Sequence, residues 1–156
     1  MRVWLKRMIL VMAALFVAIQ AVRPSRTNPP INPALEIKSF DPVSSQTGPI
    51  LSRSCDDCHS NRTVWPWYSE VAPTSWLVAH DVNEGRSKMN LSEWGSYPAK
   101  KRSDLLKDIC GEVTKGEMPI AAYTRMHTSA RLTAGDVKAL CQWTKSFERG
   151  PSGQAR

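Results

Sequence analysis

The strongest constraint on this chain is a five-residue motif, Cys55-Asp56-Asp57-Cys58-His59. Two residues between the cysteines allow one helical turn to place both thiols along the same edge of a porphyrin, where they can form thioether bonds with its two vinyl groups. The histidine follows directly, so its imidazole can reach the iron from the proximal side. The motif therefore predicts one covalently attached haem c per chain, with Cys55 and Cys58 as attachment points and His59 as an iron ligand.

Zinc binding and dithiol chemistry are the alternatives for two cysteines at this spacing. A structural zinc site usually needs two separated ligand pairs, and the other two cysteines, Cys110 and Cys141, form no second pair of this kind. A thioredoxin-like dithiol belongs in a βαβ pattern, whereas residues 45–70 show no alternation of strand and helix. Haem attachment is favoured over both alternatives.

Cys110 and Cys141 lie on the apolar faces of two expected helices. In an exported domain such cysteines often pair, but they can equally stay apart as small buried side chains. Spacing in the sequence does not give the distance between them, so a disulfide is left open.

The positive charge of the chain is concentrated at its N-terminus. The formal net charge is +7, from 21 Lys and Arg against 14 Asp and Glu. Five of the basic residues lie before residue 27, where no acidic residue occurs, so residues 27–156 have 16 basic and 14 acidic groups, a net charge of only +2. This distribution does not support a nucleic-acid-binding surface, and no nucleic-acid partner is expected.

The N-terminus itself has the pattern of an export segment. In the run from Met8 to Val22 only Gln20 is polar, and three basic residues precede the run. Such a segment keeps its basic end in the cytoplasm and directs the rest of the chain outward. We therefore expect the haem domain to lie in the periplasm.

A retained anchor is favoured over a cleaved signal peptide. The run is shorter than a hydrocarbon core of ~30 Å, but Lys6, Arg7 and Arg23 could snorkel to the two interfaces and extend the span. The small-x-small cleavage signal is poor, because Ile19 occupies the first small position. Residues 1–23 are thus predicted to form a single-pass anchor in the inner membrane.

Three further segments follow the predicted anchor. Residues 24–43 contain repeated prolines, which favour an extended tether without a core. Residues 44–148 show helical periodicity, with Gly116 as a helix stop, and no convincing strand alternation. Residues 149–156 are expected to be a flexible tail. The predicted fold class is all-α, a small cytochrome c-like helical domain preceded by an N-terminal transmembrane helix.

Met118 is the best candidate for a second iron ligand. It follows Gly116 and precedes Pro119, so it lies in a loop with a restricted backbone, where its thioether can approach the iron without an intervening helix. The alternative is an ordinary packing role. His127 is the second candidate for the ligand position, and His80, inside an expected helix, is a weaker one.

Aromatic and basic side chains near the motif are candidates for the wall of the haem pocket. A haem needs apolar walls that exclude water and set its potential, and we expect Trp67 and Trp76 among the residues that touch the ring. Arg86 is a candidate partner for a haem propionate through a charge-assisted hydrogen bond. The alternative roles are ordinary core packing for the tryptophans and a solvated surface position for Arg86.

Several strings beyond the motif are particular enough to point to relatives. They are Trp65-Pro66-Trp67-Tyr68-Ser69, Gly85-Arg86 followed by Asn90-Leu91-Ser92-Glu93-Trp94, and Met118-Pro119 with Tyr123 and His127. Together with the motif, they make residues from about 51 to 147 resemble the bacterial haem-binding domain family of small c-type cytochromes. The resemblance implies haem attachment in an exported, membrane-facing domain, and it leaves the redox protein partner unknown.

Two functional classes fit a single haem of this kind. Electron transfer uses an iron held between His59 and Met118, whereas a haem-based gas sensor or a peroxidase-like enzyme needs an open or displaceable sixth position. The short domain and the Met118-Pro119 loop favour electron transfer. We therefore expect an electron carrier rather than an enzyme, with no catalytic residues.

Overall fold

The fold is built from helices alone. The computed structural model describes residues 2–148, and within that range it contains seven α-helices, five short 3-10 helices and no strand. The α-helices are α1 (Arg2–Ile19), α2 (Thr47–Ser54), α3 (Asp56–His59), α4 (Thr74–Lys88), α5 (Ala99–Lys115), α6 (Ala121–Met126) and α7 (Ala134–Glu148). The 3-10 helices are η1 (Pro33–Leu35), η2 (Ile37–Ser39), η3 (Trp67–Glu70), η4 (Trp94–Ser96) and η5 (Thr128–Ala130). The all-α prediction is confirmed, while the expected tail at 149–156 lies outside the described residues.

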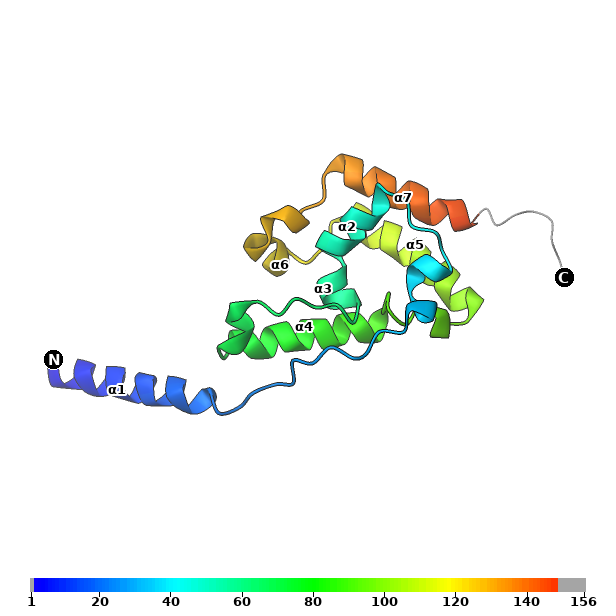
Figure 1. Ribbon diagram of the computed structural model, residues 1–156. Coiled ribbons are helices and arrows are strands. Elements are labelled where there is room, and N and C mark those ends of the chain that lie inside the picture. Colours follow the sequence, from blue (N-terminus) through cyan, green and yellow to red (C-terminus); the bar gives the residue numbers. More distant parts are fainter. Residues whose placement is uncertain (1, 149–156) are drawn as a thin grey trace.

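The core forms where α5 and α7 pack together beside α2 (Figure 1). Apolar residues recur at helical spacing along one face of α5, so that face is buried against its neighbours. The buried side chains of this core include Ile50, Leu51, Leu105, Leu106, Ile109, Val113, Leu140 and Trp143. Trp94 of η4 is fully buried in the same cluster, and its indole Nε1 donates a hydrogen bond of 2.5 Å to the Asp41 carboxylate.

A disulfide between Cys110 and Cys141 fastens α5 to α7, with a Cα–Cα distance of 4.8 Å. The sequence left open whether these two cysteines pair, and the packing of the two helices brings them close enough to do so. At its C-terminus α5 ends at Gly116, as expected, because Gly116 adopts a φ of 75° and its N–H caps the last helical carbonyls. The chain then turns directly into the loop that holds Met118.

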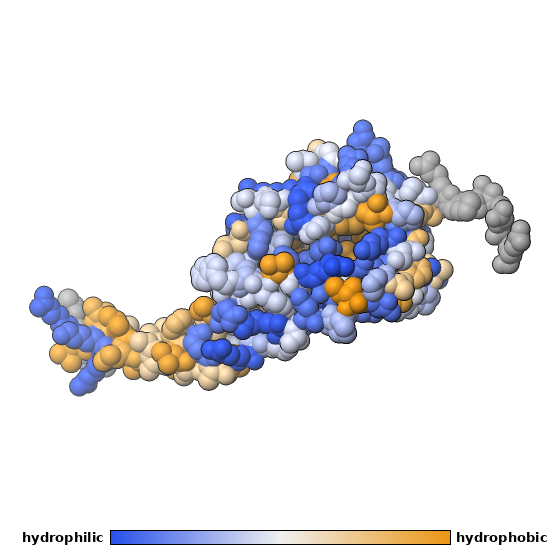
Figure 2. Space-filling view, in the orientation of Figure 1, coloured by the Kyte–Doolittle hydropathy of each residue, from blue (hydrophilic) through white to orange (hydrophobic). Residues whose placement is uncertain are grey.

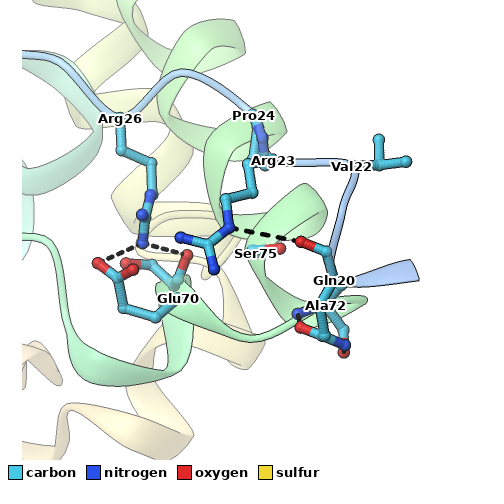
Figure 3. Close-up of a pocket in the computed structure, with 9 residues that line it drawn as sticks. Gln20, Val22, Arg23, Pro24, Arg26, Glu70, Ala72 and Ser75 are labelled. Atoms are coloured by element: carbon cyan, nitrogen blue, oxygen red, sulfur yellow. Dashed lines mark hydrogen bonds and ion pairs between the residues drawn. The ribbon is translucent and has the colours of Figure 1, made fainter. Parts of the chain in front are cut away.

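The proline-bearing segment lies along the helical body, although a tether need not do so. We call residues 20–43 the N-terminal strap. At its start the Gln20 side chain makes two hydrogen bonds with the Ala72 backbone, of 3.2 and 2.9 Å, and Arg26 forms an ion pair of 2.5 Å with Glu70 (Figure 3). Between these two residues of the strap, the Val22 carbonyl accepts a hydrogen bond of 2.7 Å from the Trp76 indole.

The second half of the strap is part of the core. Ile37 is buried, and its N–H donates to the Leu91 carbonyl at 2.9 Å. Glu36, which is also buried, forms an ion pair with Arg62, so the carboxylate is compensated within the body. The helical body and the strap therefore form one folded unit.

The predicted membrane anchor at residues 1–23 is wrong. Among residues 2–148 no helix combines the length and the apolar character needed to cross a membrane. α1 includes Arg2, Lys6 and Arg7 and ends at Ile19, so its apolar part from Met8 onward is only ~18 Å long, against a hydrocarbon core of ~30 Å. Residues 20–22, which belong to the predicted apolar run, lie beyond the helix. The expected inner-membrane localisation, which rested on this anchor, is corrected with it.

α1 projects from the helical body, and none of its residues is buried (Figures 1 and 2). Its apolar side chains form a surface that is continuous along the helix (Figure 2). The body, by contrast, mixes polar and apolar side chains on the face that Figure 2 shows.

Removal of the disulfide gives a first test of this packing. A variant with both Cys110→Ala and Cys141→Ala is expected to lose about 3 kcal/mol of unfolding free energy, because the bond closes a loop of 31 residues in the unfolded chain. Urea unfolding measures the change. Reductant should destabilise the unchanged protein by a similar amount and leave the variant unaffected. Equal stability of the two proteins without reductant would contradict the bond.

Candidate functional site

A cavity of about 460 Å³ opens in the helical body beside the cysteine motif. Cys55, Cys58 and His59 line one part of it, and α4, the apolar face of α5, and the loop between α5 and α6 line the rest. The α5 residues at the wall are Leu105, Ile109 and Val113, and the loop residues are Met118, Pro119 and Ile120. Sites for small molecules and cofactors typically enclose ~300–1,000 Å³ with largely apolar walls, so the size and lining of this cavity suit a large flat cofactor.

His59 is held in one orientation by two backbone carbonyls. Its Nδ1 lies 3.0 Å from the Gly85 carbonyl oxygen and 3.1 Å from that of Met89. Carbonyl oxygens only accept, so Nδ1 carries the proton and Nε2 keeps its lone pair. Burial lowers the pKa of His59, which favours the neutral imidazole. A ligand histidine that donates its other N–H to a carbonyl is the usual arrangement at metal sites.

The two motif cysteines are unpaired and only half-buried at the cavity wall. Burial raises the pKa of Cys55 to about 12 and that of Cys58 to about 11, and nearby acidic residues add to both shifts. Both side chains therefore remain thiols near neutral pH. Dithiol exchange requires a thiolate, so this environment weighs against it. Within residues 2–148 no cluster of three or more His, Cys, Asp or Glu could hold a metal ion.

The contact between α3 and α4 depends on the absence of a side chain at Gly85. A Cβ atom at this position would lie 2.5 Å from the Cys58 carbonyl oxygen and 3.0 Å from its carbonyl carbon. Glycine allows α4 to approach the motif backbone this closely, and the same residue supplies the carbonyl that accepts from His59. The sequence contained Gly85 as part of a family string, but its role emerges only from the helix contact.

Met118 lines the same cavity as the motif residues. Its N–H donates to the Glu112 carbonyl at 3.3 Å, so the loop is tied back to the last turn of α5. Met118 is 37 % exposed, whereas Met89, which also lines the cavity, is 9 % exposed and packs in the core. The structure thus brings Cys55, Cys58, His59 and Met118 to one cavity.

His127 lies in a hydrogen-bonded aromatic cluster behind the cavity wall, and it is not among the described residues that line the cavity. Its Nε2 is 2.6 Å from the Tyr68 hydroxyl, and its ring stacks on Tyr123 with a centroid distance of 4.3 Å. Tyr123, which does line the cavity, donates a hydrogen bond of 2.6 Å to the Asp57 carboxylate. Burial, and then this carboxylate, raises the pKa of Tyr123 and keeps the hydroxyl protonated.

The other three expected pocket residues lie elsewhere in the structure. Within residues 2–148, neither Trp67, nor Trp76, nor Arg86 lines the cavity. Trp67 is 75 % exposed, and Trp76 binds the strap through Val22. The Arg86 guanidinium donates to the Ser60 and Thr27 carbonyls at 2.9 and 3.1 Å, and so fastens the strap to the motif segment.

Sequence reasoning missed much of the wall that the cavity does have. The apolar residues of α5 gave only a helical periodicity in the sequence, although a helix with a wide apolar stripe can serve the core and a cavity at once. Two lysines at the cavity, Lys88 and Lys101, also went unnoticed. The available signal was the helical register, since Lys101 lies four residues before Leu105 on the same face.

Comparison with known proteins identifies the family of the chain. A family model described as the haem-binding domain matches residues 14–146. No curated protein and no solved structure matches the chain. The family predicted from the sequence is thereby confirmed, and its cofactor is haem. The cavity size, the neutral imidazole and the thioether at one wall all fit that cofactor.

Substitution of Gly85 tests the helix contact beneath the site. Gly85→Ala is expected to lower the unfolding free energy by about 1–3 kcal/mol, as other overpacked sites do, and to reduce the amount of haem bound per chain, because α4 must move away from Cys58 and His59. Urea unfolding and haem absorbance measure the two effects.

Gly111→Ala is the matched control, because a Cβ at that position of α5 would meet no atom within 4 Å. This variant should be unchanged or more stable by up to ~1 kcal/mol. If both glycine variants bound haem as the unchanged protein does, the close contact would have no role in the site.

Proposed function

Because the chain belongs to the haem-binding domain family, we propose that it holds one haem covalently, as haem c, and that it transfers electrons. One observation carries the proposal. Two thiols, a neutral imidazole with a free Nε2 and a thioether all line one cavity of suitable size. Few other ligands would use all four of these groups.

In this proposal Cys55 and Cys58 are the attachment points. Each thiol adds across one vinyl group, so that the sulfur bonds to one vinyl carbon and the thiol hydrogen passes to the other, without net oxidation. The raised pKa of both cysteines keeps the S–H form that this addition consumes. The two cysteines lie in one short turn, which is closed by a hydrogen bond of 2.8 Å from the His59 N–H to the Cys55 carbonyl. This turn fixes the thiols relative to the imidazole.

In the same proposal His59 and Met118 would ligate the haem iron. When bound, haem supplies an iron that cycles between ferrous and ferric states. The two carbonyl acceptors on Nδ1 orient the His59 ring and raise the basicity of Nε2. The Met118 thioether is a soft ligand that favours the ferrous state and so raises the reduction potential. An iron with both positions filled by protein suits electron transfer better than ligand activation.

An oxidising compartment, such as the periplasm, is part of the proposal. The Cys110–Cys141 disulfide supports it, since such bonds form and persist mainly outside the cytoplasm. The export character of the basic and apolar N-terminus is consistent with the same compartment.

Covalent attachment can be tested by acid–organic extraction of the denatured protein. The unchanged chain should keep its haem, and a variant with Cys55→Ala and Cys58→Ala should release it, because no thioether can form. The control variant, Cys110→Ala with Cys141→Ala, removes two cysteines outside the cavity wall and should keep the haem. Full release from the unchanged chain would refute covalent attachment.

The sixth ligand distinguishes electron transfer from sensing or peroxidase chemistry. If Met118 binds the iron, the ferric protein should show a weak near-infrared sulfur-to-iron charge-transfer band. Met118→Ala should abolish the band, lower the reduction potential and allow rapid CO binding to the reduced protein. Met126→Ala removes an exposed methionine and should change none of these.

Two other results would assign the sixth position differently. Rapid CO binding and no sulfur band in the unchanged protein would indicate an open site, and would favour the gas-sensor or peroxidase-like alternative. A spectral change in His127→Ala, with Met118→Ala unaffected, would make His127 the ligand.

A further inference from the structure

Two lysines at the cavity form no ion pair with any described side chain. Lys88 and Lys101 both line it, and neither pairs with an acidic side chain of residues 2–147. Two other lysines of α5 are paired, Lys100 with Asp104 at 2.9 Å and Lys115 with Glu112 at 2.8 Å. A cation at a ligand cavity without a protein partner is suited to bind an anionic group of the ligand.

The two lysines come from helix ends that are linked through Tyr97. Lys88 is the last residue of α4, and Lys101 lies in the first turn of α5. Tyr97 joins these ends, because its hydroxyl accepts from the Asn90 N–H at 2.9 Å and its carbonyl accepts from Arg102 at 2.9 Å. The first turn of α5 contains no acidic residue that would neutralise this region.

The acidic residues at the cavity lie farther along each helix. Asp81 and Glu84 precede Lys88 by about two turns and one turn of α4, and Asp108 and Glu112 follow Lys101 by about two and three turns of α5. Along each helix the acidic residues of the wall are therefore displaced from the lysine, which lies at the end of the helix. An asymmetric ligand with anionic groups on one edge would be oriented by such a separation.

Haem is a ligand of this kind, because it has two propionate carboxylates on one side of an otherwise apolar ring. Carboxylates are costly to bury without a partner, so they require cations or water at the cavity mouth. Arg86, the partner expected from the sequence, is already engaged, since its guanidinium donates to Asn28 and Thr63 at 2.7 and 2.8 Å as well as to backbone carbonyls.

We propose that Lys88 and Lys101 bind the haem propionates and thereby fix which edge of the ring faces the C-terminus of α4 and the N-terminus of α5. The proposal rests on haem occupying this cavity. It requires neither the thioether bonds nor Met118 ligation, so it can fail or hold independently of both.

The test uses the full-length, haem-loaded protein with Lys88→Gln, Lys101→Gln and both together. Resonance Raman spectra report the propionate bending modes directly, and potentiometry reports the charge near the iron. We expect the propionate modes to shift in each variant and most in the double variant. The reduction potential should fall, because loss of a nearby positive charge favours the ferric state. Replacement of both lysines by arginine should preserve the modes, since arginine also binds carboxylates.

Lys107→Gln is the matched control, because it removes one exposed charge from α5 at a position that does not line the cavity. It should leave the propionate modes unchanged. The proposal is overturned if the double glutamine variant has unchanged modes, or if Lys107→Gln shifts them equally. Should the double glutamine variant not retain haem, retention by the double arginine variant supports the proposal, and loss from both overturns it.

Discussion

The site depends on the close approach of α4 to the motif backbone at Gly85. Without a side chain there, the α4 backbone contacts Cys58 and presents the Gly85 and Met89 carbonyls to His59. These two acceptors decide which imidazole nitrogen is protonated and so which one is free. A single helix contact thus holds α4 against Cys58, orients the His59 ring and fixes which of its nitrogens is protonated.

Buried polar residues hold this contact in register. Asn90 donates to the Asn61 side chain at 2.8 Å, and the Ser92 hydroxyl accepts from the Asn61 N–H at 3.0 Å, so the segment after α4 is bonded to the segment after the motif. The Leu91 N–H donates to the His59 carbonyl at 2.7 Å. Each of these polar groups has a partner, and such a network favours one arrangement over others.

Local sequence patterns predicted the helical fold class and the cysteine motif. They could not predict which distant segments contact one another. Gly116 and Pro119 marked the Met118 loop because their backbone preferences act at their own positions. Arg86 was interpreted as a propionate partner, but the Thr27 carbonyl that it binds is 59 residues away in the sequence. Periodicity tells which face of a helix a residue occupies, but not which segment covers that face. The strap covers α4 near Trp76 and Arg86, which is why neither is available to the cavity.

Asp57, one of the two residues between the motif cysteines, links the two walls of the cavity. Its carboxylate accepts from the Val64 N–H at 2.9 Å and from the Tyr123 hydroxyl at 2.6 Å. Tyr123 belongs to α6, which follows the Met118 loop directly, so the motif turn is bonded to the element that begins where the loop ends. The residues between the cysteines are often regarded as a simple spacer. Here one of them, Asp57, bonds the turn that holds His59 to α6, the helix that follows the Met118 loop.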